Sequence, residues 1–440
     1  MSTRGYLPFA AILTAVALPA IPQLHQAPRI RRLGAITQVT RDSLASVASV
    51  VQLPDGRILV NDIIGQRLLI FDSSLSVLRV VLDSAGSGSS VLYGDGPGTL
   101  LPYRGDSALF ISPPTLSMLV LAPNGAVART IAMPPTQGLP SLLGSVFGTP
   151  GFDVQGRLYY YSQLLPIVPR PQPDRPFVLD FPDSALIVRF DFGTRRLDTV
   201  ASISIPKART SSFTDRQGQP VTEKTAYPIA IVDGWAVASD GKLAVVRGRD
   251  YHVDWSSASG NWAHSPRVAF PWAPLSDSEK VVLIDSAATA MQSSIDSLRA
   301  RVEAGAAARS RGSPSGRQSP GSPRPAPSAS VILGGPGGAP MAFRVVIPRV
   351  VRAATSEVPD YRPPFGQGAV YADRSGSLWI RTSQVIDGRP VYDVIDGRGQ
   401  LVDRVQLPPF RSIAGFGPGL VYLGVRDSVG IVHVERARIR

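Results

Sequence analysis

Short apolar runs of four to eight residues, bounded by Gly, Asp, Ser or Pro, follow one another along most of the chain. The clearest stretch spans residues 47–81 and contains SVVQLPDGRILVND followed by LLIFDSSLSVLRVV. The turn residues PDGR at 54–57 and DSS at 72–74 divide this stretch into four predicted strands, because Pro, Asp, Gly and Ser interrupt extended runs rich in Val, Ile and Leu. The pattern therefore predicts a unit of four consecutive strands joined by short turns.

The unit recurs with strand runs at residues 99–133, 152–201, 235–262, 369–405 and 413–439. A repeated four-stranded unit is typical of β-propellers, in which each unit is a blade that packs against its neighbours. Six such units predict an all-β fold, a six-bladed β-propeller of four-stranded blades. The sixth unit ends before its fourth strand, so we expect residues 33–39 (LGAITQV) to pair with the C-terminal blade and close a ring formed by residues 33–440.

An insertion separates the fourth and fifth units. Ser276 and Glu279 form a capping-box pattern, and apolar residues then recur at spacings of three and four up to Val302. This pattern predicts an amphipathic helix at 276–304, which lies against the propeller wall or serves as a partner surface. Residues 305–340 are rich in Gly, Pro, Ser and Arg, and too few of them are apolar to offset the entropy of ordering. We expect a disordered, cationic linker there.

The N-terminus has the pattern of an export signal. Arg4 precedes an apolar stretch of about fifteen residues at 7–21, which is shorter than the roughly 20 residues that span a bilayer. Ala15-Val16-Ala17 and Ala20 offer cleavage sites for a signal peptide of residues 1–20. The pattern predicts an exported chain, periplasmic or extracellular, with no membrane span after signal removal. The alternatives are an uncleaved anchor or a buried strand.

The composition limits the catalytic and metal-binding groups that the chain can offer. The chain has no cysteine, four histidines, five glutamates and three asparagines, which excludes disulfides and thiolate sites and leaves few metal ligands. Its net charge of +12 comes almost entirely from arginine. The arginines are scattered singly along strands and loops, without the aromatic interleaving of a nucleic-acid surface, so the charge favours an anionic ligand or protein partner over nucleic acid.

The repeats resemble the NHL/TolB-like superfamily of six-bladed propellers. The resemblance is carried by LPDGRILVND with LLIFDSSLSVLRVV and by YADRSGSLWIRT with YDVIDGRGQLVDRV. The order of further motifs is similar to that of exported bacterial six-bladed propellers: Tyr251 and Trp255, Pro271-Trp272, and the DYRPPF segment at 360–365. The resemblance implies the fold and no particular activity, because this fold carries many unrelated functions.

Four arginines stand close to the end of the second strand in three units. In propellers of this family, the loops at that point open on the ligand face. Because guanidinium groups match carboxylate and phosphate oxygens, these arginines are the candidate ligand-binding residues. They are Arg247, Arg249, Arg381 and Arg426. The alternative is that they form structural salt bridges between blades.

Catalytic candidates are few. The chain has no G-x-S-x-G, H-E-x-x-H or P-loop motif, so we assign no catalytic residue, no metal site and no cofactor. The remaining weak candidates are Asp62 at the end of a second strand and Asp250 with His252, which alternate with Asp254 on one face of a strand. His252 there could act as a general base, bind a metal or serve a structural purpose.

Taken together, the sequence predicts an exported propeller that acts as a ligand-binding or protein-interaction scaffold, for an anionic ligand or an envelope partner. The alternative is a propeller hydrolase, lactonase or lyase that uses the central channel. Lactonases of this fold hold a divalent ion with Glu, Asn and Asp, and amidating lyases hold zinc with several histidines, and this chain has few of each. A third alternative is a structural module that assembles through the helix. The sequence leaves the oligomeric state open.

Overall fold

The computed structural model describes most of the chain. The described residues are 28–84, 92–94, 96–112, 117–135, 139–144, 146–163, 177–214, 216, 220–257, 260–312, 329–334, 340–345 and 347–439. The signal peptide expected at residues 1–20 lies outside them. Within these ranges, no helix is both long enough and apolar enough to cross a membrane.

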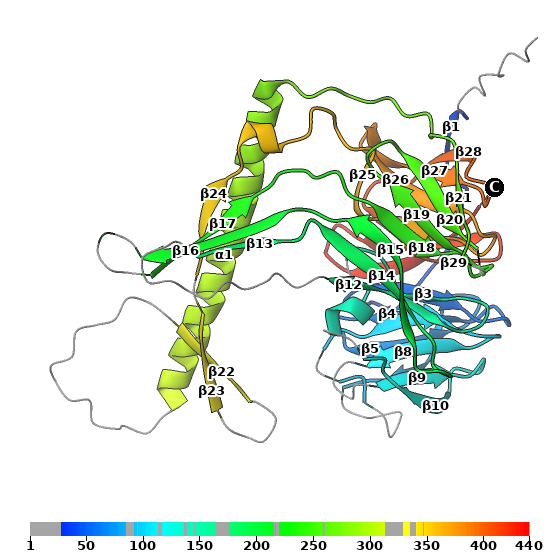
Figure 1. Ribbon diagram of the computed structural model, residues 1–440. Helices are drawn as coiled ribbons and strands as arrows, with labels where there is room; N and C mark the ends of the chain where they lie inside the picture. The colour runs from blue at the N-terminus through cyan, green and yellow to red at the C-terminus, as the bar shows by residue number, and fades with distance from the viewer. Residues whose placement is uncertain are drawn as a thin grey trace, which may run out of the picture.

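Most of the described chain forms antiparallel four-stranded sheets that follow one another in sequence (Figure 1). The first contains β3 (Ser49–Gln52), β4 (Ile58–Asp62), β5 (Arg67–Phe71) and β6 (Val77–Leu82). The second contains β7 (Thr99–Pro102), β8 (Ala108–Ser112), β9 (Ser117–Leu121) and β10 (Val127–Ala132). The third contains β11 (Gly151–Phe152), β12 (Leu158–Gln163), β14 (Ser184–Phe190) and β15 (Leu197–Ser204), and the short helix η1 (Leu139–Leu142) precedes it.

The second half of the chain continues the pattern. One sheet contains β18 (Gly234–Val237), β19 (Leu243–Arg247), β20 (His252–Ser256) and β21 (Trp262–His264). The next contains β25 (Phe365–Ala372), β26 (Leu378–Ile386), β27 (Arg389–Ile395) and β28 (Leu401–Gln406), with β1 (Ile30–Arg32) parallel to β28 at its edge. The last contains β29 (Arg411–Gly417), β30 (Leu420–Arg426), β31 (Val432–Arg438) and β2 (Ile36–Val39).

The core lies between neighbouring sheets. Each sheet buries alternate apolar side chains against the sheet before it and the sheet after it, because the side chains of a strand point to both faces. Between the first two sheets, for example, Leu59 packs near Phe110, and both are completely buried. Another cluster joins the last sheet to the first through Val60, Tyr422 and Val434. This mainly β architecture of four-stranded sheets packed face to face is consistent with a β-propeller.

The N-terminal strand β2 lies in the last sheet. Its residues pair antiparallel with β31, with Ile36 opposite Ala437 and Val39 opposite Glu435. Thr40 follows the strand and is buried, and its hydroxyl accepts a hydrogen bond from the Val434 amide at 3.1 Å. The two ends of the chain are therefore held in one sheet, at the position where the strand count places residues 33–39.

A separate four-stranded sheet accompanies the propeller sheets, and the sequence analysis did not predict it. This accessory sheet contains β13 (Phe177–Phe181), β16 (Ala208–Thr214), β17 (Pro220–Ala226) and β24 (Arg349–Arg352), and β17 and β24 are parallel. In Figure 1, β13 and β16 reach from the propeller sheets toward the helix. Stretches such as RTSSFT and VTEKTA lack continuous apolar runs, so their pattern predicts connections between blades and not strands.

The inserted helix packs on the accessory sheet. Helix α1 (Asp277–Gly312) starts at the expected capping box, where the Ser276 amide donates to Glu279 Oε2 at 2.9 Å. Its buried stripe includes Ile284, Ala288 and Ile295, and the helix contacts β17, β24 and η2 (Thr355–Glu357). The partner of the predicted amphipathic face is thus the accessory sheet, which the sequence analysis did not include.

The helix also extends beyond the expected end at residue 304, into the segment expected to be a linker. The sequence GAAARSR favours continuation because Ala and Arg are strong helix formers. A hairpin of β22 (Ala329–Gly334) and β23 (Pro340–Val345) lies in and just past the rest of that segment, where the runs VIL and MAFRV are apolar. Residues 313–328 and 335–339 of the expected linker are outside the described residues.

Replacing Thr40 by Val tests the joining of the two chain ends. We expect Thr40→Val to lower the free energy of unfolding by about 1–3 kcal/mol, because the buried Val434 amide loses its hydroxyl acceptor. Thr37→Val, an exposed position on the same strand, is the matched control and should change stability by less than about 0.5 kcal/mol. Urea denaturation followed by tryptophan fluorescence measures both. Equal effects of the two variants would contradict a closure that depends on Thr40.

Candidate functional site

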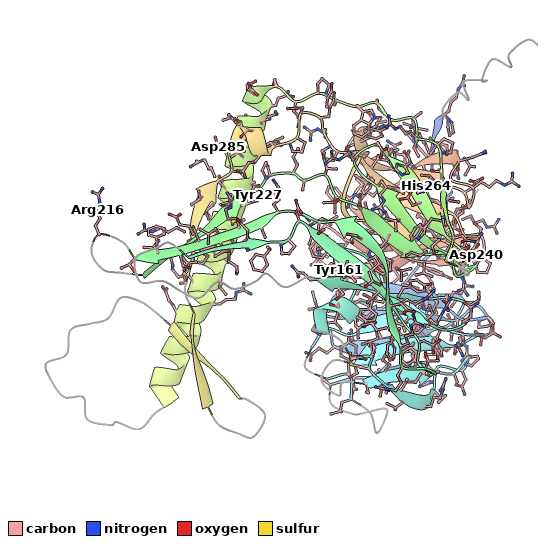
Figure 2. The ribbon with its side chains drawn as sticks, viewed as in Figure 1. Tyr161, Arg216, Tyr227, Asp240, His264 and Asp285 are labelled. Atoms are coloured by element: carbon pink, nitrogen blue, oxygen red, sulfur yellow. The ribbon has the colours of Figure 1, made fainter. Side chains whose placement is uncertain are left out.

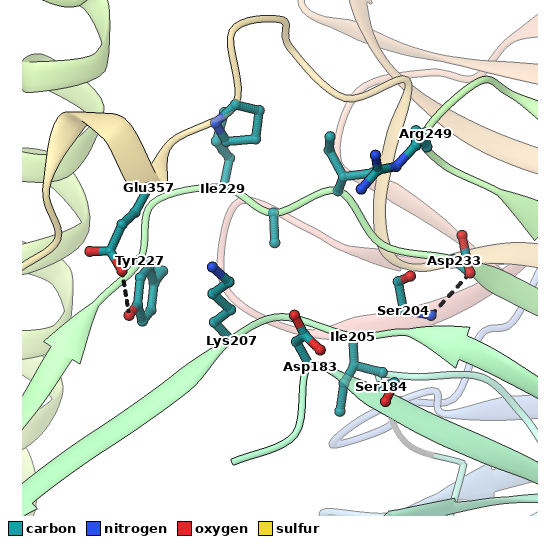
Figure 3. Close-up of a pocket in the computed structure, with 13 residues that line it drawn as sticks. Asp183, Ser184, Ser204, Ile205, Lys207, Tyr227, Ile229, Asp233, Arg249 and Glu357 are labelled. Carbon is teal, nitrogen blue, oxygen red and sulfur yellow. Dashed lines mark hydrogen bonds between the residues drawn. The ribbon is translucent and has the colours of Figure 1, made fainter. Parts of the chain in front are cut away.

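A cavity of about 260 Å³ lies where the chain passes between the propeller sheets and the accessory sheet (Figure 3). Its walls come from the connections that join the two, together with the turn after β19. These connections are β13 to β14, β15 to β16, β17 to β18, and β24 to β25. The cavity therefore exists because the chain leaves the propeller to build the accessory sheet and then returns.

Hydrogen bonds between the connections fix the floor of the cavity. The Ile205 amide donates to the Asp183 carbonyl at 2.8 Å, and the Asp233 amide donates to the Ser204 carbonyl at 2.9 Å. The Ser204 amide in turn donates to Asp233 Oδ2 at 3.0 Å, as the dashed line in Figure 3 shows. Three connections that are distant in sequence are thus tied together at one point.

Two cationic side chains line the cavity, one from a connection and one from the turn after β19. Lys207 follows β15 and Arg249 lies in the turn after β19, and both side chains extend toward the space between the connections in Figure 3. Both residues are exposed, and neither forms a hydrogen bond or an ion pair with another residue in the described part of the chain. Because unpaired cations at a cavity attract negative charge, this is the feature of the cavity that favours a ligand.

The acidic side chains around the cavity differ in their pairing. The Tyr227 hydroxyl donates to Glu357 Oε1 at 3.2 Å, and the Ala354 amide donates to Glu357 Oε2 at 3.1 Å. Burial and the neighbouring Glu357 carboxylate raise the pKa of Tyr227, so this phenol keeps its proton and acts as a donor. Asp183, by contrast, is exposed at the rim of the cavity.

Asp233 belongs to an ion-pair network with Arg247. Arg247 Nη1 lies 2.9 Å from Asp233 Oδ2, and Arg247 Nε lies 2.7 Å from Asp254 Oδ2. Burial lowers the pKa of Arg247, but the hydrogen bonds and charges of Asp254 and Asp233 outweigh it and raise the value overall. Arg247 thus connects two carboxylates and also donates to the Ser202 carbonyl at 2.9 Å, so its guanidinium is held by three partners within the fold.

The structure does not gather the four candidate arginines at the cavity. Arg249 lines it, and Arg247 is engaged in the network beside it. Arg381 is exposed on β26 and Arg426 donates to the Gly430 carbonyl at 3.0 Å, and neither is among the lining residues. The main addition is Lys207, which the sequence analysis missed because it belongs to a connection and not to a repeated unit.

Asp62 caps a turn. It is completely buried, and its carboxylate accepts hydrogen bonds from the amides of Ser46 at 2.8 Å and Gly65 at 3.0 Å. Arg67 Nη2 pairs with the same carboxylate at 2.8 Å. Burial raises the pKa of Asp62, but the Arg67 hydrogen bond and the amide hydrogen bonds outweigh it, so the pKa lies below 3.8. Its oxygens are fully used, which leaves no lone pair for general-base chemistry.

Asp250 and His252 are in contact at the start of β20, as the alternation predicts. His252 Nδ1 lies 2.8 Å from Asp250 Oδ1, and His252 Nε2 lies 3.0 Å from Asp254 Oδ1. His264 on β21 joins them, with its Nδ1 2.6 Å from Asp254 Oδ1. Burial raises the pKa of Asp254, but Arg247 and the histidines more than offset this effect and lower it. His264 could not be predicted from local spacing, because only the pairing of β20 with β21 brings it opposite Asp254.

Comparisons with known proteins give structural similarities only. No protein-family model and no curated protein sequence matches the chain. A gluconolactonase from Xanthomonas campestris has a TM-score of 0.40 at 11% identity, covering 96% of this chain and 98% of its own. Virginiamycin B lyase from Staphylococcus aureus has a TM-score of 0.35 at 8% identity, covering 92% and 98%. An aldose sugar dehydrogenase from Streptomyces coelicolor has a TM-score of 0.38 at 13% identity, covering 93% and 99%. The assignment of the fold depends on the sheets of this chain and not on these weak similarities.

Replacing Asp62 by Asn tests its structural role. We expect Asp62→Asn to lower the free energy of unfolding by about 1–3 kcal/mol, because buried amides and Arg67 lose a charged acceptor. Asp55→Asn is the matched control, since Asp55 pairs with Arg57 on the surface and should contribute less than about 1 kcal/mol.

The pH dependence of this loss follows from the lowered pKa of Asp62. The carboxylate is ionised in both the folded and the unfolded chain at pH 5 and pH 7, so the destabilisation should be equal at these two values. It should shrink only as the pH falls through the folded pKa, below 3.8. Urea denaturation of both variants at each pH gives the result. A loss that disappears between pH 7 and pH 5 would show that Asp62 is not held as a buried carboxylate.

Proposed function

We propose that this protein is an exported six-bladed β-propeller of the NHL/TolB-like type that binds an anionic ligand in the cavity beside its accessory sheet. The observation that carries the proposal is the pair of cations, Lys207 and Arg249, that line one cavity with no ion-pair partner in the described chain. A scaffold function fits this arrangement, because the cavity presents charge for recognition and two of its carboxylates, Asp233 and Glu357, are engaged in hydrogen bonds.

The blade count is supported by the packing of the sheets. Apolar clusters join successive sheets along the chain, and the cluster with Val60 and Tyr422 joins the last to the first. The pairing of β2 with β31 supplies the fourth strand of the last sheet. Six blades account for all of these contacts. The export proposal depends on the apolar stretch at residues 7–21 that follows Arg4.

The chemistry of the cavity defines the class of ligand. An ammonium and a guanidinium group together suit a carboxylate or phosphate, since both donate charge-assisted hydrogen bonds to oxygen. The Tyr227 hydroxyl on the same wall already donates to Glu357 Oε1, so the two cations are the donors that the cavity offers to an anion. With a volume of about 260 Å³, the cavity fits a small organic anion or one acidic side chain of a partner protein.

The alternative of a hydrolase, lactonase or lyase in the central channel has less support. Asp62 has its carboxylate oxygens occupied by amides and Arg67. Asp250 and His252 lie at the start of β20, the third strand of its sheet, and β19 separates β20 from the first strand, β18. The catalytic candidates Asp62, Asp250 and His252 therefore do not lie together on the first strand of a sheet.

Binding of defined anions tests the proposal. Citrate, inorganic phosphate and a short poly-glutamate peptide are titrated into the full-length protein by calorimetry, with thermal shift as a second measurement. We expect saturable binding of at least one, which raises the melting temperature because the ligand binds the folded state. Lys207→Gln and Arg249→Gln should each weaken it by about 10- to 150-fold, the equivalent of a charged hydrogen bond of about 1.5–3 kcal/mol.

Arg426→Gln is the matched control, because Arg426 is exposed and lies outside the cavity. It should leave the affinity unchanged apart from a small effect of net charge. If none of the three anions binds, or if Arg426→Gln weakens binding as much as Arg249→Gln, the cavity is not the anion site. Circular dichroism of each variant verifies that the fold is intact.

A further inference from the structure

Two histidines and an aspartate converge on the outer strands of the β18–β21 sheet. His252 and Asp254 belong to β20, and His264 lies on β21, on the propeller side of the molecule in Figure 2. The ligating atoms of the three side chains all lie within 4.8 Å of one another. This cluster is distinct from the cavity, because none of its three members is among the lining residues.

The strand register dictates the convergence. Residues 252 and 254 share a face of β20, because side chains alternate along a strand. His264 is directly opposite Asp254 in the β20–β21 pair, and Arg247 is directly opposite His252 in the β19–β20 pair. The turn before β20 is anchored by Tyr251, which is completely buried and donates to Asp393 Oδ2 at 2.9 Å. The cluster is therefore built on the sheet and not on mobile side chains.

His252 lies between two carboxylates. Its Nδ1 is 2.8 Å from Asp250 Oδ1, and its Nε2 is 3.0 Å from Asp254 Oδ1. An imidazole that binds a metal ion through the Nε2 lone pair keeps Nδ1–H to donate to Asp250.

His264 adds a second imidazole to the cluster. Its Nδ1 approaches the same Asp254 Oδ1 at 2.6 Å, and the two imidazole nitrogens and the carboxylate oxygen all lie within 4.8 Å of one another. Two imidazoles and a carboxylate are a donor set that proteins use for zinc and for non-haem iron. A carboxylate on the far nitrogen of a metal-binding histidine is likewise a typical supporting contact, and Asp250 occupies that place on His252.

We propose that His252 Nε2, Asp254 Oδ1 and His264 Nδ1 bind a divalent transition-metal ion, with Asp250 orienting His252. Asp254 binds through one oxygen only, because its Oδ2 is held by Arg247 at 2.7 Å. The site opens to solvent on one side, since the His264 side chain is 70% exposed while that of Asp254 is 6% exposed. Water or an external ligand completes the coordination there. The proposal does not depend on the anion cavity.

Zinc binding to the full-length protein tests the proposal. The protein is treated with a chelator and dialysed, and ZnCl₂ is titrated by calorimetry, with Co²⁺ as a spectroscopic substitute that reports nitrogen and oxygen coordination. We expect one zinc per chain. Asp250→Ala should weaken zinc binding by about 10- to 100-fold, as loss of a supporting carboxylate does. His264→Ala and His252→Asn each remove a ligand and should weaken it by more than that.

His433→Gln is the matched control, because His433 also stands near a carboxylate, at 3.6 Å from Asp427, but has no second histidine in the described chain beside it. It should leave zinc binding unchanged. His264→Ala removes an exposed side chain and keeps the test valid even if His252→Asn destabilises the sheet.

Three results would overturn the proposal. One is the absence of stoichiometric zinc binding. Another is zinc binding that His264→Ala abolishes and a folded His252→Asn variant retains, since this shows a single surface histidine. The third is an NMR spectrum in which His252 keeps protons on both ring nitrogens with and without added zinc, since a proton then occupies the place of the metal.

Discussion

The burial of each sheet between its two neighbours is the constraint on which the rest of this structure depends. A four-stranded sheet has two apolar faces in this chain, so no sheet is stable alone, and each must pack on the sheet before it and the sheet after it. The first and last sheets bury their remaining faces against each other, through Val60, Tyr422 and Val434. Strand β2, which precedes the first sheet along the chain, pairs with β31 in the last sheet. The cavity is formed by turns and connections attached to this frame, and the histidine–aspartate cluster is formed by two of its strands, β20 and β21.

The accessory sheet turns those connections into a cavity. After β12 the chain enters the accessory sheet as β13 and returns to the propeller at β14. After β15 it enters the accessory sheet again and returns at β18, and after β24 it passes to the propeller once more. Each connection carries polar backbone, and hydrogen bonds such as that from the Ser204 amide to Asp233 satisfy it. Of the two cations that line the cavity, Lys207 lies on one of these connections and Arg249 lies in the turn after β19, and neither has a partner in the described chain. The connection from β15 to β16 thus brings Lys207 to the same cavity as Arg249.

Much of the architecture could be predicted from the sequence, and the site could be predicted only in part. Turn residues such as those at 54–57 divide apolar runs at the points where β3 and β4 end and begin. The accessory sheet was not predicted because β16 and β17 contain few apolar residues, and because β17 packs against α1, which is distant in the sequence. Lys207 and His264 were missed for the same physical reason. Their neighbours are set by the pairing of strands and connections, and local spacing does not encode which segments meet.

Asp254 is part of the buried propeller sheet and also part of the proposed metal site. It is buried in the sheet, and its two oxygens have different partners: Arg247 on one, and His252 with His264 on the other. Arg247 also holds Asp233, so one guanidinium serves two carboxylates, and the Asp254 oxygen that faces the histidines is not fully neutralised by it. The divalent cation proposed at this point adds positive charge beside that oxygen and engages all three side chains at once.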